Sequence, residues 1–156
     1  MSRKQQSELG LSFLCRIPIA RDGGKSIRTP EDVASEMVEI RDAAQEIFAV
    51  LYLNTRNHLL DRKVIGIGVT DCCLVHAREV FRPAILSLSV AIVLCHNHPS
   101  GDPSPSAEDI RLTRQLIQAG QVIGIKVMDH IILGRPSSDK SRDYVSLREG
   151  GLCVFD

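Results

Sequence analysis

The sequence has 156 residues, a length that suits one globular domain. A domain of this size has a core large enough to be stable without disulfide bonds or a structural metal ion. With 44% hydrophobic and 24% charged residues it has the composition of an ordinary soluble protein, and its formal net charge of zero argues against a basic body that binds phosphates through counterion release. It contains no Trp and only 4% aromatic residues, so it offers few aromatic side chains on which nucleic-acid bases could stack.

The chain begins with a basic segment. Residues 1–30 carry six Lys or Arg residues against two acids, whereas residues 31–50 carry six acids against one Arg. Because residues 1–28 lack sustained hydrophobic periodicity, we expect a basic N-terminal segment there, which could be mobile, and one catalytic domain over residues 29–156. The positive charge could give weak contact with nucleic acid, but a solvated terminus is the simpler interpretation and the favoured one.

Helix and strand patterns alternate along the rest of the chain. Thr29-Pro30-Glu31-Asp32 has the features of a helix start, with Thr at the N-cap, Pro at the first helical position and acids in the first turn. This alternation predicts an α/β fold in which a mixed β-sheet is flanked by helices. Helices are expected from residue 29, over 74–88 and over 106–121, and strands over 46–53, 59–67, 90–95, 127–133 and 144–147.

The residues that carry chemistry lie in the stretch LCHNHPSGDPSPSAED, residues 94–109. Strand side chains alternate between faces, so His96 and His98 at the end of an apolar run can point the same way. The prolines that follow force an irregular loop, and Ser106 then stands as an N-cap, which places Asp109 in the first turn of a helix. Two imidazoles and a carboxylate are typical ligands of a catalytic zinc site, in which a fourth position stays open for water.

A purely structural interpretation of the same residues stays open. Ser106-Ala107-Glu108-Asp109 is close to a capping box, in which the side chain at the third helical position reaches back to the N-cap backbone. From the local pattern alone, capping and metal ligation explain Asp109 equally well. A single His is usually a surface residue or one satisfied by hydrogen bonds, whereas two His separated by one residue, beside Gly-Asp-Pro, favour a metal site.

The stretch resembles a known family motif. His96-x-His98-Pro99, followed by six residues and then Ser106-x-x-Asp109, matches the JAMM motif of the JAB/MPN metalloproteases at every defined position. The fuller text HNHPSGDPSPSAEDIRLT resembles the RadC branch of that superfamily, and so do LVHAREVF, DHIILG and YVSLRE. The resemblance covers most of the chain and implies the three-layer, cytidine-deaminase-like arrangement of JAB/MPN domains.

The resemblance also implies a zinc-dependent hydrolase. Zn²⁺ would be held by His96, His98 and Asp109, and it would bind one water. Glu46, at the start of the strand EIFAVLYL, would be the general base for that water, although from the local pattern alone it could equally be the acidic end of a helix. Ser106 would donate a hydrogen bond to the oxyanion. The implied reaction is hydrolysis of an amide or isopeptide bond in a peptide or protein substrate.

Two other functions stay open. RadC proteins carry a DNA-repair label, so the metal site could belong to a protein that acts on or near nucleic acid. The longer RadC proteins have an N-terminal helix-hairpin-helix domain that binds DNA, and we expect this chain to be a short form without it, which weakens the case for a direct DNA role. A metal-free scaffold is disfavoured because every residue of the motif is present.

The remaining candidate residues have simpler interpretations. The five cysteines are odd in number and fit no disulfide framework, and nothing resembles a signal peptide or a membrane span, so we expect a reduced, cytoplasmic protein with no membrane partner. Asp129 and His130 lie on a strand that could border the site, and His76 begins a helix. Structural roles are favoured for Asp129 and His130, and His76 is expected to be a helix cap or a surface residue. No feature of the sequence indicates an oligomeric state.

Overall fold

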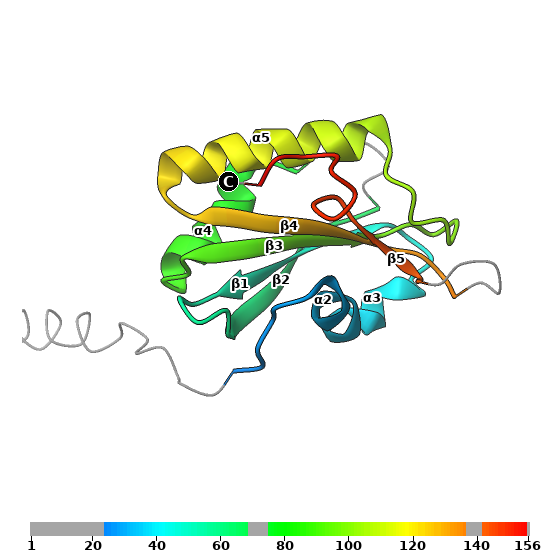
Figure 1. Cartoon of the computed structure of the whole chain (residues 1–156), viewed down its shortest axis with the longest axis horizontal. Helices are drawn as coiled ribbons and strands as arrows, with labels where there is room; N and C mark the ends of the chain where they lie inside the picture. The colour runs from blue at the N-terminus through cyan, green and yellow to red at the C-terminus, as the bar shows by residue number, and fades with distance from the viewer. Residues whose placement is uncertain (1–23, 69–74, 137–141, 156) are drawn as a thin grey trace, which may run out of the picture.

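The computed structural model describes residues 24–68, 75–136 and 142–155. One five-stranded sheet runs through it in the order β2-β1-β3-β4-β5 (Figure 1). β3 and β4 are parallel and the other neighbours are antiparallel, so the sheet is mixed. The strands are β1 (Ile47–Leu53), β2 (Leu59–Ile67), β3 (Ala91–Asn97), β4 (Lys126–Leu133) and β5 (Tyr144–Ser146).

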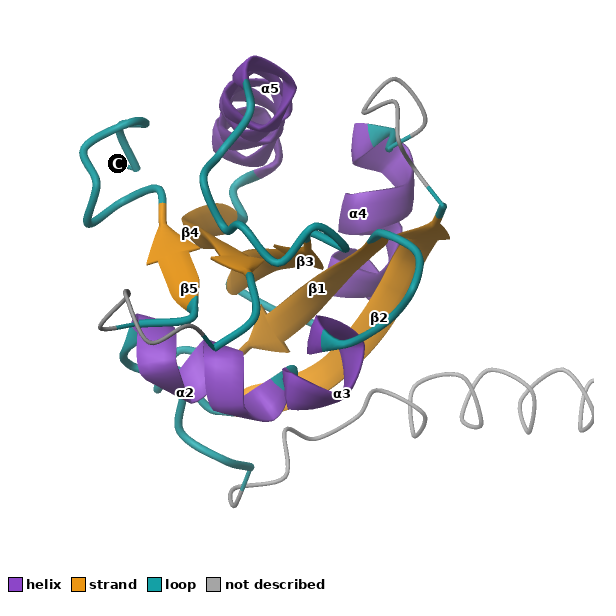
Figure 2. Cartoon of the chain, turned by 90° about the vertical axis from the view of Figure 1, so that its right-hand side faces the viewer, coloured by secondary structure: helices purple, strands orange, loops and turns teal. Residues whose placement is uncertain are grey.

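Helices cover both faces of the sheet, which gives three layers (Figure 2). In β1 the side chains alternate, so Phe48 and Val50 pack toward α4 and α5, whereas Ala49 and Leu51 pack toward α2 and α3. Both faces of the central strands are therefore buried, as their continuous apolar sequences require. The helices are α2 (Pro30–Glu36), α3 (Val38–Arg41), α4 (Ala77–Leu86) and α5 (Ala107–Ile123).

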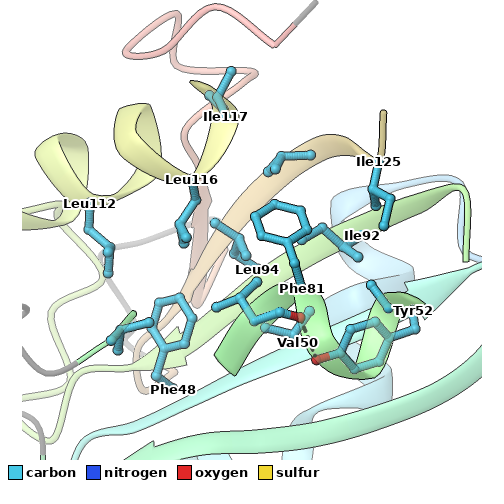
Figure 3. Close-up of a cluster of buried hydrophobic side chains, with 14 of the residues drawn as sticks. Phe48, Val50, Tyr52, Phe81, Ile92, Leu94, Leu112, Leu116, Ile117 and Ile125 are labelled. Atoms are coloured by element: carbon cyan, nitrogen blue, oxygen red, sulfur yellow. Dashed lines mark hydrogen bonds between the residues drawn. The ribbon is translucent and has the colours of Figure 1, made fainter. Parts of the chain in front are cut away.

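The larger core lies between the sheet and the α4/α5 layer. Figure 3 shows Phe81 of α4 and Leu116 of α5 directed toward Leu94 of β3. The hydroxyl of buried Tyr52 is satisfied, because it donates to the Val80 carbonyl at 3.1 Å, a contact drawn as a dashed line in Figure 3. This core extends to Phe48 near the start of β1, which pairs with His96 near the end of β3, so it lies beside the candidate site residues.

The predicted α/β fold with a mixed sheet between helices is confirmed. Thr29 caps α2 as expected, because its hydroxyl accepts from the Asp32 N–H at 3.2 Å and the Asp32 carboxylate accepts from the Thr29 N–H at 2.8 Å. The helix expected from residue 29 is divided at Met37 into α2 and α3. Its apolar residues Val33, Met37 and Ile40 are nevertheless all buried.

The helix expected over 74–88 is shorter, since α4 covers only Ala77–Leu86, and the first residue of the expected range lies outside the described part of the chain. Ile85 fits the apolar period, yet it is 56% exposed because α4 turns its other side to the sheet, and Leu88, also 56% exposed, lies beyond the end of α4. Among the residues that the structure describes, no helix is both long and apolar enough to cross a membrane.

Most of the predicted basic segment, residues 1–23, lies outside the described residues. The part that is described packs on the domain. Ile27 is 3% exposed, and the Lys25 carbonyl accepts from the Leu59 N–H at 2.9 Å. The division between a segment and a domain at residue 28 stays a prediction.

The loop after β3 is held against the end of β4. The His98 N–H donates to the Leu133 carbonyl and the Arg135 N–H donates to the Gly101 carbonyl, both at 2.9 Å. A Cβ at Gly134 would lie 2.5 Å from the Gly101 oxygen, so only glycine permits this approach. The position of His98 therefore depends on the close contact between this loop and β4.

Candidate metal centre

Three potential ligands converge where the end of β3 meets the start of α5. His96 is the last residue but one of β3, His98 follows the strand, and Asp109 stands in the first turn of α5. His96 Nε2 lies 3.0 Å from His98 Nε2 and 3.2 Å from Asp109 Oδ1, and His98 Nε2 lies 3.5 Å from Asp109 Oδ2. The ligand atoms of all three lie within 4.8 Å of one another, so the residues predicted as ligands are neighbours in space.

A backbone carbonyl fixes the orientation of His98. Its Nδ1 lies 2.7 Å from the Asp102 carbonyl oxygen. Because a carbonyl can only accept, Nδ1 carries a proton, and in the neutral ring Nε2 keeps its lone pair. That lone pair faces Asp109. Metal-binding histidines commonly donate their second ring N–H in this way.

Asp109 both caps α5 and faces the histidines. Its Oδ2 accepts from the Ser106 N–H and from the Ser106 hydroxyl, each at 2.7 Å, and its own N–H donates to Ser106 Oγ at 3.1 Å. Burial opposes its ionisation, but the adjacent His96 and His98 side chains and the Ser106 hydroxyl outweigh burial and hold the pKa of Asp109 well below the usual carboxyl range. Asp109 can therefore take part in the cap of α5 and face the two histidines at the same time.

Glu46 lies beside the three residues, immediately before β1. Its Oε1 is 4.0 Å from His96 Nε2, and its side chain is 20% exposed. Burial raises the pKa of Glu46, although the nearby histidines oppose that rise. A carboxyl group with a raised pKa can take up and return a proton nearer to neutral pH, which is the property that general acid–base catalysis requires.

Asn97 anchors the segment that carries Glu46. Its side chain is completely buried on the face of β3 opposite to the histidines. Its Oδ1 accepts from the Ile47 N–H at 2.8 Å, and its Nδ2 donates to the carbonyls of Gln45 at 3.2 Å and Ala43 at 3.4 Å. These bonds hold the backbone on both sides of Glu46. Sequence reasoning gave Asn97 no role, although a polar residue within a buried strand was an available signal.

A third histidine lies behind His96. His130 of β4 is completely buried, and its Nε2 lies 2.8 Å from His96 Nδ1. Its Nδ1 lies 2.6 Å from Thr113 Oγ1. Burial lowers the pKa of His130 well below the usual range, so its ring is neutral. A structural role was favoured for His130, but the structure brings it into direct contact with a candidate ligand.

A family model described as the RadC-like JAB domain matches residues 27–152. The chain belongs to this family. The match confirms the resemblance to the RadC branch, and the mixed sheet between two helical layers is consistent with the JAB/MPN fold expected from it. The candidate ligands lie within the matched residues.

Named relatives support the same assignment. A UPF0758 protein of Bacillus cereus (strain G9842) is 50% identical over 127 residues, which are 81% of this chain and 54% of that relative. A UPF0758 protein of Bacillus mycoides (strain KBAB4) is 49% identical over the same shares. The chain thus spans about half the length of the curated relatives it matches. Their names assign no activity, so the chemistry of the RadC-like domain has to be argued from its site.

The donor set of the RadC-like domain fits a zinc ion. Zinc binds imidazole nitrogen and carboxylate oxygen at about 2.0–2.2 Å in tetrahedral sites, which places ligand atoms roughly 3.3–3.5 Å apart. The two Nε2 atoms are 3.0 Å apart, and they lie 3.2 and 3.5 Å from the two different oxygens of Asp109, so with one atom from each residue the group lies within 4.8 Å. A cation at this point would contact both Nε2 atoms and the carboxylate and would offset the negative charge of Asp109.

Two further candidates have structural contacts. Asp129 accepts hydrogen bonds from the Ser146 hydroxyl at 2.6 Å, the His130 N–H at 2.7 Å and the Arg148 N–H at 3.1 Å, which tie the C-terminal part of the chain to β4. His76 occupies the N-cap position of α4, where its side chain makes no capping hydrogen bond. Neither contributes an atom to the His-His-Asp cluster.

Proposed function

We propose that this RadC-like JAB domain is a zinc-dependent hydrolase of JAMM type that cleaves amide or isopeptide bonds in a peptide or protein. The observation that carries the proposal is the convergence of His96 Nε2, His98 Nε2 and the Asp109 carboxylate within 4.8 Å. Glu46, 4.0 Å from His96, adds a proton-accepting group beside them. Three protein ligands leave a coordination position for water, which is the arrangement of catalytic rather than structural zinc sites.

Each side chain has a distinct task in this mechanism. When bound, zinc supplies a Lewis acid that lowers the pKa of a water and polarises the scissile carbonyl. Glu46 accepts the proton of the attacking water and later delivers it to the leaving amine. Ser106 turns its hydroxyl hydrogen away from Asp109 Oδ2, its present partner at 2.7 Å, and donates to the oxyanion. Asn97 keeps the Glu46 segment in place through its three hydrogen bonds.

The variant Glu46→Gln tests the proposal. Glutamine keeps the size of the side chain but cannot take up the proton, so zinc content should stay at one per chain while hydrolysis is lost. Glu31→Gln is the matched control, because Glu31 is an exposed acid in the first turn of α2, on the other face of the sheet. It should keep both properties.

The assay measures metal content and the cleavage of a panel of quenched peptides and isopeptide-linked peptides, with and without a chelator. Wild-type protein should cleave at least one member of the panel, and the chelator should stop it. Cleavage that survives chelation would refute the zinc mechanism, and unchanged turnover in Glu46→Gln would remove Glu46 from it.

A role near nucleic acid remains a second proposal, supported by the basic residues of segment 1–28. One of them is already engaged, since Lys25 pairs with Glu36 at 3.1 Å. We also propose that the protein works in the reducing cytoplasm. This is supported by Cys95 and Cys153, which are buried free thiols in the described part of the chain.

A further inference from the structure

A chain of hydrogen bonds runs from His96 back to the backbone of α5. His96 Nδ1 lies 2.8 Å from His130 Nε2, and His130 Nδ1 lies 2.6 Å from Thr113 Oγ1. Thr113 Oγ1 in turn lies 2.6 Å from the carbonyl oxygen of Asp109. The four residues are at most 3% exposed, so water cannot readily substitute for any partner in the chain.

The direction of every bond follows from the last acceptor. The Asp109 carbonyl can only accept, and two oxygens 2.6 Å apart need a hydrogen between them, so the single hydroxyl hydrogen of Thr113 points to that carbonyl. Thr113 Oγ1 must then accept from His130 Nδ1–H. A neutral His130 has one ring proton, so its Nε2 is an acceptor, and His96 Nδ1–H must donate to it.

We propose that Thr113 and His130 are positioning residues that hold His96 in the tautomer with its proton on Nδ1, so that Nε2 offers its lone pair to a cation. This inference deepens the proposed function and rests on the metal site described there. This chain of hydrogen bonds from His96 to Asp109, called the relay below, ends on the Asp109 carbonyl. It therefore also ties the orientation of the His96 ring to the helix turn that carries Asp109.

The opposite direction is disfavoured by the site itself. A Thr113 hydroxyl that donated to His130 would leave oxygen lone pairs facing each other across 2.6 Å. The relay would then place the proton of His96 on Nε2, the atom that faces His98 and Asp109, and the ring could bind no cation without turning. The side chain of His98 needs no such relay, since the Asp102 carbonyl fixes its tautomer directly.

Two substitutions at Thr113 separate hydrogen bonding from packing. Thr113→Val keeps the branched shape and loses the hydroxyl, whereas Thr113→Ser keeps the hydroxyl and loses a methyl group. Loss of an outer-shell partner of a metal-binding His commonly lowers metal affinity about 10–100-fold. We therefore expect zinc affinity, measured by competition with a chromophoric chelator, to fall by about that factor in Thr113→Val and to stay near wild type in Thr113→Ser. Equal affinities in the three folded proteins, or a larger loss in Thr113→Ser, would overturn the proposal.

A spectroscopic measurement decides the tautomer without zinc. The protein has five histidines, so long-range ¹H–¹⁵N correlation spectra of the ¹⁵N-histidine-labelled, metal-free chain at a pH where the rings are neutral can be assigned, with His96→Gln identifying the signal. We expect the Nδ1–H form of His96 in wild type and in Thr113→Ser, and a mixture of tautomers in Thr113→Val. An Nε2–H form in wild type would overturn the relay. A wild-type protein that bound no zinc would refute the proposed function, while these spectra would still decide the relay.

Discussion

Ser106 has two roles in this proposal, capping α5 and donating to the oxyanion, and substitution can separate their effects on stability and on rate. As the N-cap of α5, its Oγ accepts from the Asp109 N–H at 3.1 Å, and its hydroxyl hydrogen goes to Asp109 Oδ2 at 2.7 Å. Ser106→Ala removes the cap and should cost about 0.5–2 kcal/mol of stability. Ser106→Gly also removes the hydroxyl, but because glycine is a good N-cap residue it should cost only about a few tenths of a kcal/mol.

The proposed oxyanion contact has a larger expected effect on the rate. Loss of one such donor typically lowers kcat by about 10²–10³, or about 2.7–4 kcal/mol of transition-state stabilisation. Ser106→Gly should therefore fold almost normally and yet be slow. Ser106→Thr keeps a hydroxyl at the same position and serves as the control, with stability and kcat both close to wild type.

The assay combines denaturant unfolding, zinc content and kcat on the best substrate from the peptide panel. Ser106→Gly with normal zinc content and nearly normal kcat would refute the oxyanion role and confine Ser106 to capping. Loss of zinc in the same variant would show that the hydroxyl acts through Asp109, its hydrogen-bond partner, rather than on the substrate.

Three further predictions concern other parts of the chain. The double variant His96→Ala, His98→Ala should lose stoichiometric zinc in elemental analysis, and a variant that kept one zinc per chain would place the site elsewhere. DNA binding should be weak, salt-sensitive and lost when residues 1–23 are removed, and undiminished affinity after that removal would move the binding surface to the domain. The cut precedes the predicted boundary because Ile27 is buried. Asp32→Asn should lower the free energy of unfolding at neutral pH. Hydrogen bonds from two backbone N–H groups lower the pKa of Asp32, so its contribution is present above the unfolded-state value of about 3.9 and is lost as pH falls through the lower folded-state value. An equal difference between variant and wild type in strongly acidic solution would contradict this.

Much of the fold could be predicted from local patterns. The strands expected over 46–53 and 59–67 agree with β1 and β2 to within one residue, and Thr29 and Ser106 cap their helices as expected. Alternation, helical period and capping depend on residues only a few positions apart, so a short window of sequence contains the whole signal. The exposure of Ile85 shows the limit of such patterns, because a period cannot say which side of a helix meets the sheet.

The candidate metal ligands could also be predicted from the sequence, because they belong to one contiguous stretch. A strand end presents His96 and His98, and a capped helix start presents Asp109. The family resemblance rests on that same stretch, and the family match over residues 27–152 confirms it. Whether these residues bind zinc and catalyse hydrolysis stays a prediction, which the metal and peptide assays test.

The hydrogen bonds that link His96 to His130 and Thr113 could not be predicted from the sequence in this way. His130 is 34 positions from His96, and the two rings meet because β4 pairs with β3 in parallel, in a register that sets His130 opposite Leu94. Thr113 reaches His130 only because α5 packs on that face of the sheet. The sequence by itself determined which residue types stand at a strand end and at a helix start. Strand register and helix docking are decided by the burial of whole sheet faces, so only the tertiary structure decided which side chains touch behind them.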